Sequence, residues 1–513
     1  MKKLLFLIPI IVSILSCSSS KKFKTNSSEI VNFTILQFND FYEIAPLEKG
    51  TIGGAARMAT LRKKLLEENP NLLTVLAGDF ISPSLIGTLK VDGEGIKGKQ
   101  IIEVLNAVGI NLVTFGNHEF DYDQKTLQKR INESNFDWVS TNVNEIKDGV
   151  KNAFKKEKSG FKMAIPRHVS LTFKNIQGGF VNVGIVAPCI DANKVKYVEY
   201  DDINTSISQE LKALSSNTNF YISLSHLNKE MDMKIATDFP ILDLILGGHE
   251  HDNMMFKIGK TTLTKADANA KSAYVHRISY NIKTKKYKLN SELVKLNSSI
   301  ALDDKVNQIV TQWKDIESRT IRNMGFDPDQ EIQGSEVKYD ARETILRNEP
   351  ADFTSMICRS MMKTCPTCDA AIMNSGSVRL DDVIEGHISQ YDILRALPYA
   401  GSLVELNLTG NLLTKILDAG WNNKGKGGFL QWAEITRTNS GQWLINNSSI
   451  NSSKSYHIIL NEFLLTGLEK GLEFLTKENS EISNVITVDP SNKENIRRDI
   501  RLVIIDYLKK GGR

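Results

Sequence analysis

A chain of 513 residues is too long for one ordinary hydrophobic core, so its length predicts two or more domains. With 41% hydrophobic and 24% charged residues, the composition is that of a globular protein and excludes collagen-like and coiled-coil proteins. The formal net charge of +4 is small for this length and gives no case for a nucleic-acid polymer as partner. Nothing in the sequence calls for an obligate protein partner either.

The first residues differ from the rest of the chain. Two lysines precede an apolar run from Leu4 to Leu15, which suits a secretory signal and is too short to span a membrane. The sequence Ile14-Leu15-Ser16-Cys17 resembles the bacterial lipobox, which implies lipidation of Cys17; the alternative is a chance cysteine behind an ordinary signal peptide. We therefore expect a lipoprotein signal peptide at 1–17 and a polar tether at 18–30. The protein would then be exported and lipid-anchored to a bacterial membrane, in the periplasm or at the cell surface.

From residue 31 to about residue 300, strand-like and helix-like segments alternate, which predicts a layered α/β domain. Short apolar runs rich in β-branched residues predict strands at Phe33–Phe38, Leu72–Ala77, Leu112–Phe115, Phe180–Ala187, Phe220–Leu224 and Leu242–Leu246. Amphipathic stretches predict helices at Ala55–Leu66, Lys99–Val108 and Ser206–Leu214.

A charged stretch without Gly or Pro, Asp303–Arg322, carries apolar residues at helical spacing and predicts a linking helix within 301–328. A second domain is expected at 329–513. In it we expect helices near Thr354–Met362 and Ile393–Ala396, and strands near Val404–Thr409 and Tyr456–Leu460.

The cysteines beyond Cys17 are Cys189, Cys358, Cys365 and Cys368. Because export permits disulfides, the Cys365-Pro-Thr-Cys368 segment is expected to hold a structural disulfide or two plain thiols. A redox-active pair and half of a zinc site are competing interpretations. No second CxxC completes such a zinc site, and nothing around the pair looks like a thioredoxin unit.

Metal-capable residues follow five of the predicted strands: Asp40, Asp79, Asn117 with His118, His226, and His249 with His251. Taken singly, a strand-terminal Asp is more often a turn residue, and a lone His is more often a surface or core residue. The carboxyl ends of strands in open α/β sheets are nevertheless where binding sites are built. Since half of the eight histidines fall in these motifs, the sequence predicts one convergent polar cluster.

The order Asp, Gly-Asp, Gly-Asn-His-Glu, His and Gly-His-x-His resembles the calcineurin-like metallophosphoesterases. With Gly53-Gly54-Ala55-Ala56-Arg57 after the first motif and a second domain behind, the chain resembles the bacterial 5′-nucleotidase branch of that family. The resemblance implies an N-terminal four-layer α/β/β/α sandwich followed by a smaller α/β domain that binds substrate.

The resemblance also implies two divalent metal ions. Its ligands would be Asp40, Asp79, Asn117, His226, His249 and His251, with Asp79 bridging the two ions. Histidine and carboxylate ligands favour Zn²⁺, Mn²⁺ or Fe²⁺ over Mg²⁺ or Ca²⁺. By the same resemblance, His118 is not a ligand but reaches the phosphoryl group or the leaving oxygen, and Asp121 orients it.

The second domain carries motifs of its own. Met373-Asn374-Ser375-Gly376-Ser377-Val378-Arg379 resembles the family's NxGxxR element, and its structural alternative is an ordinary turn. The resemblance implies that Asn374, Gly376 and Arg379 bind the substrate. It also implies that Tyr399 and Phe463 sandwich the base of a nucleotide, although aromatic pairs at such spacings are also common in cores.

Two positions depart from the family pattern. Relatives usually read Asp-x-His at the first motif, but here Tyr42 follows Asp40-Phe41. The phenol could ligate as a phenolate, hydrogen-bond a metal-bound water, or pack. The other departure is Gly467-Leu468-Glu469, where relatives have Gly-Gly-Asp.

The expected function is hydrolysis of a nucleotide phosphoester, with a nucleoside 5′-monophosphate as the leading substrate. A 2′,3′-cyclic phosphodiesterase/3′-nucleotidase and a UDP-sugar hydrolase are alternatives within the same class. An alternative outside the enzymes is a degenerate surface lipoprotein that binds a nucleotide or a host component without turnover. Tyr42 and Glu469, which depart from the family pattern, favour this alternative.

Overall fold

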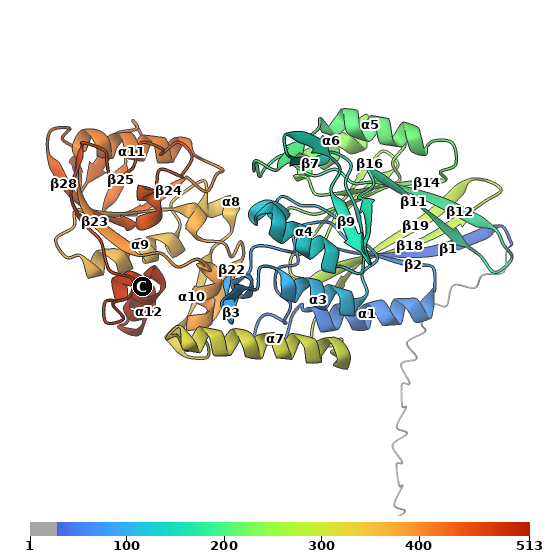
Figure 1. Ribbon diagram of the computed structural model, residues 1–513, viewed down its shortest axis with the longest axis horizontal. Helices are drawn as coiled ribbons and strands as arrows, with labels where there is room; N and C mark the ends of the chain where they lie inside the picture. The colour runs from blue at the N-terminus through green and yellow to red at the C-terminus, as the bar shows by residue number, and fades with distance from the viewer. Residues whose placement is uncertain (1–27, 513) are drawn as a thin grey trace, which may run out of the picture.

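The computed structural model describes residues 28–512 and places two domains side by side along its long axis (Figure 1). Cys17, the predicted signal peptide and most of the predicted tether lie outside the described residues. Within the described part of the chain, no helix combines the length and the apolar character that crossing a membrane requires.

Two six-stranded sheets form the first domain. In spatial order, the first sheet consists of β19 (Lys286–Lys295), β18 (Ser272–Asn281), β1 (Ile30–Phe38), β2 (Leu72–Leu76), β5 (Leu112–Thr114) and β6 (Asp137–Val139). The second consists of β11 (His168–Lys174), β12 (Phe180–Val186), β14 (Phe220–Ser225), β15 (Leu244–Gly247), β17 (Thr261–Lys265) and β16 (Met254–Ile258).

The two sheets face each other across an apolar core that includes Phe33, Val75, Val183, Ile222 and Leu246. Helices α1 (Ala55–Glu68) and α3 (Lys99–Val108) cover the outer face of the first sheet, and α5 (Ile203–Leu214) and α6 (Lys229–Asp238) cover that of the second. The arrangement is a four-layer α/β/β/α sandwich, as predicted. Strands buried on both faces read as continuous apolar runs, which is why the sequence revealed them.

The inner strands of both sheets run parallel. β1 pairs with β2, and β2 pairs with β5, all in parallel, and β14 and β15 do the same in the second sheet. Parallel neighbours end at the same edge of a sheet, so the loops that follow β1, β2, β5, β14 and β15 meet at one edge of the sandwich. This topology positions the candidate site.

The second domain is built on one five-stranded sheet. Its strands are β24 (Leu430–Ala433), β21 (Ala370–Asn374), β28 (Ser455–Asn461), β23 (Leu403–Thr409) and β29 (Ile482–Ile486). Helix α11 (Gly410–Asn422) packs on one face, and α9 (Asp352–Thr364) and α12 (Ile500–Lys509) pack on the other. The smaller α/β domain expected behind the sandwich is therefore present.

The remaining elements are short or lie at the edges of the domains. They are α2 (Leu85–Thr88), α4 (Gln124–Glu133), α8 (Glu343–Leu346), α10 (Gln390–Ala396), β3 (Lys90–Val91), β4 (Glu94–Gly95), β7 (Val143–Lys147), β8 (Val150–Asn152), β9 (Lys155–Lys158), β10 (Phe161–Ala164), β13 (Val198–Tyr200), β20 (Glu331–Asp340), β22 (Val383–Ser389), β25 (Ile435–Arg437), β26 (Trp443–Ile445) and β27 (Ser448–Ser449).

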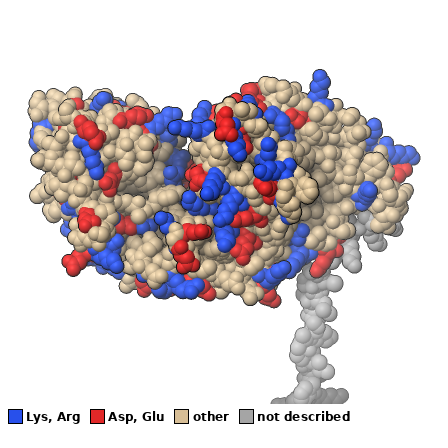
Figure 2. Space-filling view, in the orientation of Figure 1, with Lys and Arg blue, Asp and Glu red and all other residues tan. Residues whose placement is uncertain are grey.

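A long helix, α7 (Asp304–Asn323), runs along both domains (Figure 1). The Asp303 side chain caps its first turn by accepting a hydrogen bond from Val306 N. The helix packs against α1 and α3 of the first domain, and Lys314 Nζ lies 2.8 Å from the Tyr391 hydroxyl on α10 of the second. On the face drawn in Figure 2, basic and acidic side chains are interspersed, and the surface is notched where the domains meet.

Candidate functional site

The five strand-end loops bring the predicted residues together. Asp79, His226 and His249 offer ligand atoms that all lie within 4.8 Å of one another. His226 Nε2 is 3.0 Å from Asp79 Oδ2, and its other ring nitrogen lies 2.8 Å from Ala77 O. A backbone carbonyl at the second nitrogen is the arrangement that fixes the ring of a metal-binding histidine.

Asn117 lies in the loop after β5, next to His118, whose backbone N–H donates a hydrogen bond to Asp79 Oδ1 at 2.8 Å. The side-chain Oδ1 of Asn117 is buried and accepts no hydrogen bond from any described residue. Because leaving a buried amide oxygen without a partner costs about 1–3 kcal/mol, such an oxygen indicates a missing ligand. A divalent cation beside Asp79, His226 and His249 fits it, and this donor set of imidazole, carboxylate and amide oxygen suits Zn²⁺, Mn²⁺ or Fe²⁺.

Asp40, His251 and Tyr42 form the neighbouring half of the site. His251 Nε2 lies 3.5 Å from Asp40 Oδ1. The Tyr42 hydroxyl lies 3.3 Å from Asp40 Oδ1, 3.2 Å from Asp79 Oδ2 and 3.3 Å from His251 Nε2. Burial, followed by the charge of Asp79, raises the pKa of Tyr42 well above its usual value. The tyrosine that replaces the expected histidine thus points its hydroxyl into the site rather than packing elsewhere.

The backbone of these loops is unusual. Asp40, Asp79 and His249 adopt positive φ angles of 51°, 54° and 84°, which cost non-glycine residues conformational energy. A Cβ on Gly116 would lie 2.1 Å from Asp79 Oδ1, and one on Gly248 would lie 2.3 Å from Ala77 O. Only glycine permits these close approaches, which explains the glycines in the Asn and His motifs.

Glu119 holds two of the loops in place, a role that the sequence did not reveal. Its carboxylate accepts backbone N–H bonds from Asp79 at 3.0 Å, Phe80 at 2.8 Å and Ile81 at 3.1 Å. Burial and the nearby Asp79 carboxylate raise the pKa of Glu119 to about 7, against the effect of these hydrogen bonds. The Glu of the Gly-Asn-His-Glu motif therefore acts on the loop backbone and not on the cluster directly.

His118 and Asp121 form a pair at the mouth of the site, on a 3-10 turn. His118 Nδ1 lies 2.9 Å from Asp121 Oδ2, which leaves Nε2 as the ring nitrogen available to a ligand. Asn193 Nδ2 and Ser82 Oγ donate hydrogen bonds to Asp121, at 2.9 and 3.0 Å. Burial alone would lower the pKa of His118, but the charges of Asp121 and then Asp79 raise it to about 9.

Arg379 and Asn374 are the two polar candidates that the second domain contributes. The guanidinium charge of Arg379 acts on His118, and its Nε is buried without a hydrogen-bond partner among the described residues. Asn374 donates to Glu469 Oε2 at 2.8 Å, so the glutamate that departs from the family pattern holds this amide. Gly376 lies against Gly427, where a Cβ would come within 3.0 Å of the Gly427 Cα atom.

Tyr399 and Phe463 are the two expected aromatics. The two residues are 47% and 43% exposed. They are therefore not core residues. Burial and then the charge of Asp121 raise the pKa of Tyr399. Both residues are thus accessible to a ligand from solvent.

Two further residues could not be singled out from the sequence. Asp381 reaches across from the second domain, with its Oδ2 2.6 Å from His251 Nδ1. Lys265 is fully buried behind the loop after β15, where its Nζ lies 2.8 Å from Asp232 Oδ2 and donates to Gly248 O at 2.7 Å. It also pairs with Glu250, in the middle of the Gly-His-Glu-His motif. A lone lysine at the end of a strand gives no sequence signal of such a role.

Two family models match the chain. Residues 33–253 match the calcineurin-like phosphoesterase model, and residues 332–476 match the model of the 5′-nucleotidase C-terminal domain. The sandwich with Asp, Asn and His at its strand ends is thus a metallophosphoesterase domain. The chain belongs to the phosphoesterases that join this domain to a 5′-nucleotidase C-terminal domain, and these matches indicate a phosphoester hydrolase.

Known proteins are similar to most of this chain. The trifunctional nucleotide phosphoesterase protein YfkN of Bacillus subtilis is 23% identical over 80% of this chain, which spans only 31% of that protein. The 5′-nucleotidase of Bos taurus is 23% identical over 81% of this chain and 78% of its own length. Among solved structures, the 5′-nucleotidase precursor from Thermus thermophilus has a TM-score of 0.69 at 20% identity, covering 94% of this chain and 97% of that one. That likeness shows the same fold.

Proposed function

We propose that this protein hydrolyses nucleotide phosphoesters with two divalent metal ions, and that nucleoside 5′-monophosphates are its main substrates. The observation that carries the proposal is the convergence of Asp79, His226 and His249 beside the His118–Asp121 pair, together with the Asn117 oxygen that has no partner among the described residues. Names of relatives support the substrate class, since they include 5′-nucleotidases and a nucleotide phosphoesterase.

The metal ligands follow from the placement of the side chains. Asn117, His226 and His249 would hold one ion, Asp40 and His251 the other, and Asp79 lies between the two groups. When bound, a pair of Zn²⁺, Mn²⁺ or Fe²⁺ ions supplies an activated water and binds phosphoryl oxygens. The chain supplies loops whose positions are fixed by Glu119 before any metal binds.

His118 would act on the substrate rather than on a metal. Asp121 fixes the ring by its contact with Nδ1, and Asn193 and Ser82 in turn fix Asp121. A proton on His118 Nε2 can then be donated to the oxygen that leaves phosphorus, where negative charge develops. Arg379 adds a positive charge on the same side, from the second domain.

The second domain would bind the nucleoside. Tyr399 and Phe463 present half-exposed rings, on which a base can stack, and Arg379 has a buried Nε without a described partner. A 2′,3′-cyclic nucleotide or a UDP-sugar presents the same base and phosphate to these groups. Glu469, bound to Asn374, favours a substrate that can donate a hydrogen bond to a carboxylate.

A substrate screen separates these candidates. AMP, UDP-glucose, 2′,3′-cyclic AMP and 3′-AMP are offered to the protein loaded with Mn²⁺, with Zn²⁺ and with no metal. We expect AMP to give the highest kcat/KM with metal, and no turnover without it. If no ester is hydrolysed and fewer than one ion binds per chain, the protein is a binding lipoprotein and the proposal fails.

We further propose that the protein is exported and anchored by lipid on Cys17, and that the domain limits are 31–300 and 329–513, with 301–328 as the link. Cys17→Ser is expected to move the protein from the membrane fraction to the soluble one. If Cys17→Ser and the wild type divide in the same way between the membrane and soluble fractions, Cys17 is not lipidated and the alternative of an ordinary signal peptide with a chance cysteine holds.

A further inference from the structure

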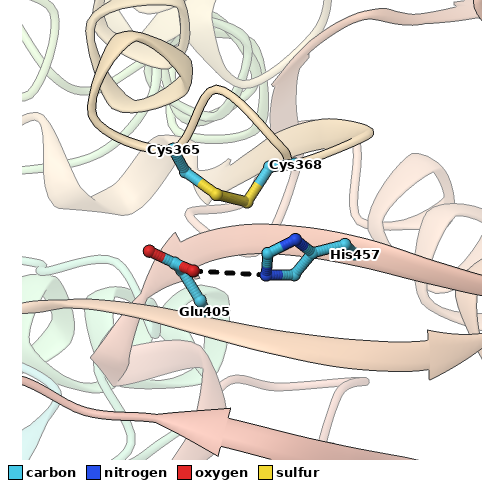
Figure 3. A group of neighbouring side chains, drawn as sticks. All are labelled: Cys365, Cys368, Glu405 and His457. Atoms are coloured by element: carbon cyan, nitrogen blue, oxygen red, sulfur yellow. Dashed lines mark ion pairs between the residues drawn. A yellow bond between two sulfur atoms is a disulfide. The ribbon is translucent and has the colours of Figure 1, made fainter.

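Four side chains able to bind metal gather in the second domain, apart from the strand-end site: Cys365, Cys368, Glu405 and His457 (Figure 3). One potential ligand atom from each lies within 4.8 Å of all the others. The cluster sits at the start of β28, whereas Phe463 follows the end of that strand. It is therefore separate from the residues proposed to bind the nucleotide.

The fold builds this cluster from three segments. β23 and β28 are antiparallel, with Glu405 opposite Ile459 and Asn407 opposite His457. Because alternate residues of a strand share a face, Glu405 and His457 are diagonal neighbours on one side of the sheet. The turn after α9, which carries both cysteines, lies over that side, so that the sulfurs face the carboxylate and the imidazole (Figure 3).

Each polar member also has a supporting partner. Glu405 Oε2 lies 3.2 Å from His457 Nε2, while its other oxygen accepts a hydrogen bond from Arg497. His457 Nδ1 lies 3.3 Å from Thr367 O. A proton on Nδ1 that is donated to this carbonyl leaves Nε2, beside the carboxylate, able to bind a cation. Partners of this kind orient metal ligands in proteins.

In the structure the two cysteines form a disulfide, with Cα atoms 5.4 Å apart. Two cysteines separated by two residues are also the usual spacing of thiolates around zinc. The cysteines are buried, but the His457 side chain is 25% exposed, so reductant and cation can reach the cluster from solvent. The sequence offered only half of a zinc site, and the fold supplies the other half.

We propose that reduction of the Cys365–Cys368 disulfide turns this cluster into a binding site for one zinc-like divalent cation. A two-electron reductant breaks the S–S bond and yields two thiols: a dithiol gives up its two protons and becomes a disulfide, and a phosphine becomes a phosphine oxide with the oxygen and the two protons of one water molecule. Binding of the cation by both sulfurs releases the two thiol protons. The ligands are then two thiolates, His457 and Glu405, a four-coordinate set that zinc accepts.

Cobalt tests the proposal, because Co²⁺ bound by thiolates shows a sulfur-to-metal charge-transfer absorption that oxygen and nitrogen ligands do not give. The proposed strand-end ligands contain no sulfur. The purified full chain is titrated with Co²⁺ before and after reduction by a phosphine. We expect the absorption band only after reduction, with one additional ion bound per chain.

Variants locate the site. Cys365→Ser with Cys368→Ser is expected to abolish the band, and His457→Gln and Glu405→Gln are each expected to weaken Co²⁺ binding at least tenfold. Cys358→Ser is the matched control, since Cys358 is a buried free thiol of α9 outside the cluster, and it should keep the band. The proposal fails if the reduced, folded wild type shows no band. It also fails if His457→Gln binds Co²⁺ as tightly as the wild type.

Discussion

His251 Nδ1 lies 2.6 Å from Asp381 Oδ2, in an ion pair that joins a metal-ligand candidate of the first domain to the second domain. Asp381 in turn accepts a hydrogen bond from Glu343 N and adopts a positive φ of 45°. The orientation of the His251 ring therefore depends on how the two domains meet. The second domain would thus both bind the substrate and help to form the metal site.

Replacing Asp381 with Asn should weaken binding of one metal ion and leave the other unaffected. Loss of a carboxylate behind a metal-binding histidine typically costs about 10–100-fold in affinity. Metal titration of the apo-protein would show one weakened and one unchanged site. Asp382→Asn is the control, because the Asp382 carboxylate pairs with Lys271 across the same domain boundary but does not contact His251. If both variants lose the same metal affinity, the affinity depends on contact between the domains in general and not on the ion pair of Asp381 with His251.

Changing Tyr42 to His should strengthen the same metal site. The Tyr42 hydroxyl already lies about as close to Asp40, Asp79 and His251 as a ligand would, and an imidazole there can bind a cation without first losing a phenol proton. We expect affinity at this site to rise about tenfold, or roughly 1.4 kcal/mol. Tyr42→Phe, which removes only the hydroxyl, serves as the companion variant. A Tyr42→His variant with unchanged metal affinity would show that the tyrosine is not in a ligand position.

Replacing His118 with Ala should slow turnover while both metals stay bound. General acid catalysis of this kind contributes about 10²–10⁴-fold, so kcat should fall within that range, with a small change in KM. Asp121→Asn should have a smaller effect, since it disturbs only the orientation of the ring. Steady-state kinetics with parallel metal analysis provide the test. Loss of metal from His118→Ala would instead make His118 a ligand.

Lys265 should contribute strongly to the stability of the first domain. Lys265→Met leaves the fully buried Asp232 without its cation and Gly248 O without its donor. Breaking a buried ion pair in this way costs about 3–5 kcal/mol, so the thermal midpoint of the first domain should fall by several degrees. Lys234→Met, which removes an exposed lysine paired with the partly exposed Asp238, is the control and should change the midpoint little. A midpoint for Lys265→Met equal to that of Lys234→Met would contradict the assigned role.

The sequence predicted the strand-end cluster because parallel strands end at one edge, so residues far apart in the chain converge without any need for side-chain detail. It also located α3 to the residue, since apolar spacing sets that helix and Gly109, at a φ of 84°, ends it. Strand limits differed by up to three residues, since β1 begins at Ile30 rather than Phe33 and β15 begins at Leu244 rather than Leu242. Residues next to a strand can be as apolar as the strand itself, so the sequence does not mark the residue at which hydrogen bonding to the neighbouring strand begins.

Other relationships could not be read from the sequence. The contact of His251 with Asp381 joins residues 130 positions apart in different domains, and no periodic pattern marks it. Likewise, Glu405 and His457 read as ordinary strand residues, and only the register of β23 against β28 places them beneath the CxxC turn. Register and domain contact depend on packing of the whole chain, which local residue patterns do not specify.

The most direct test of the two-metal mechanism is release of inorganic phosphate from AMP by the apo-protein as Mn²⁺ or Zn²⁺ is added back in measured amounts. We predict no release from the apo-protein and activity that rises to a maximum at two ions per chain, with His226→Ala unable to reach it. Full phosphate release without added metal, or activity in His226→Ala equal to that of the wild type, would contradict that mechanism.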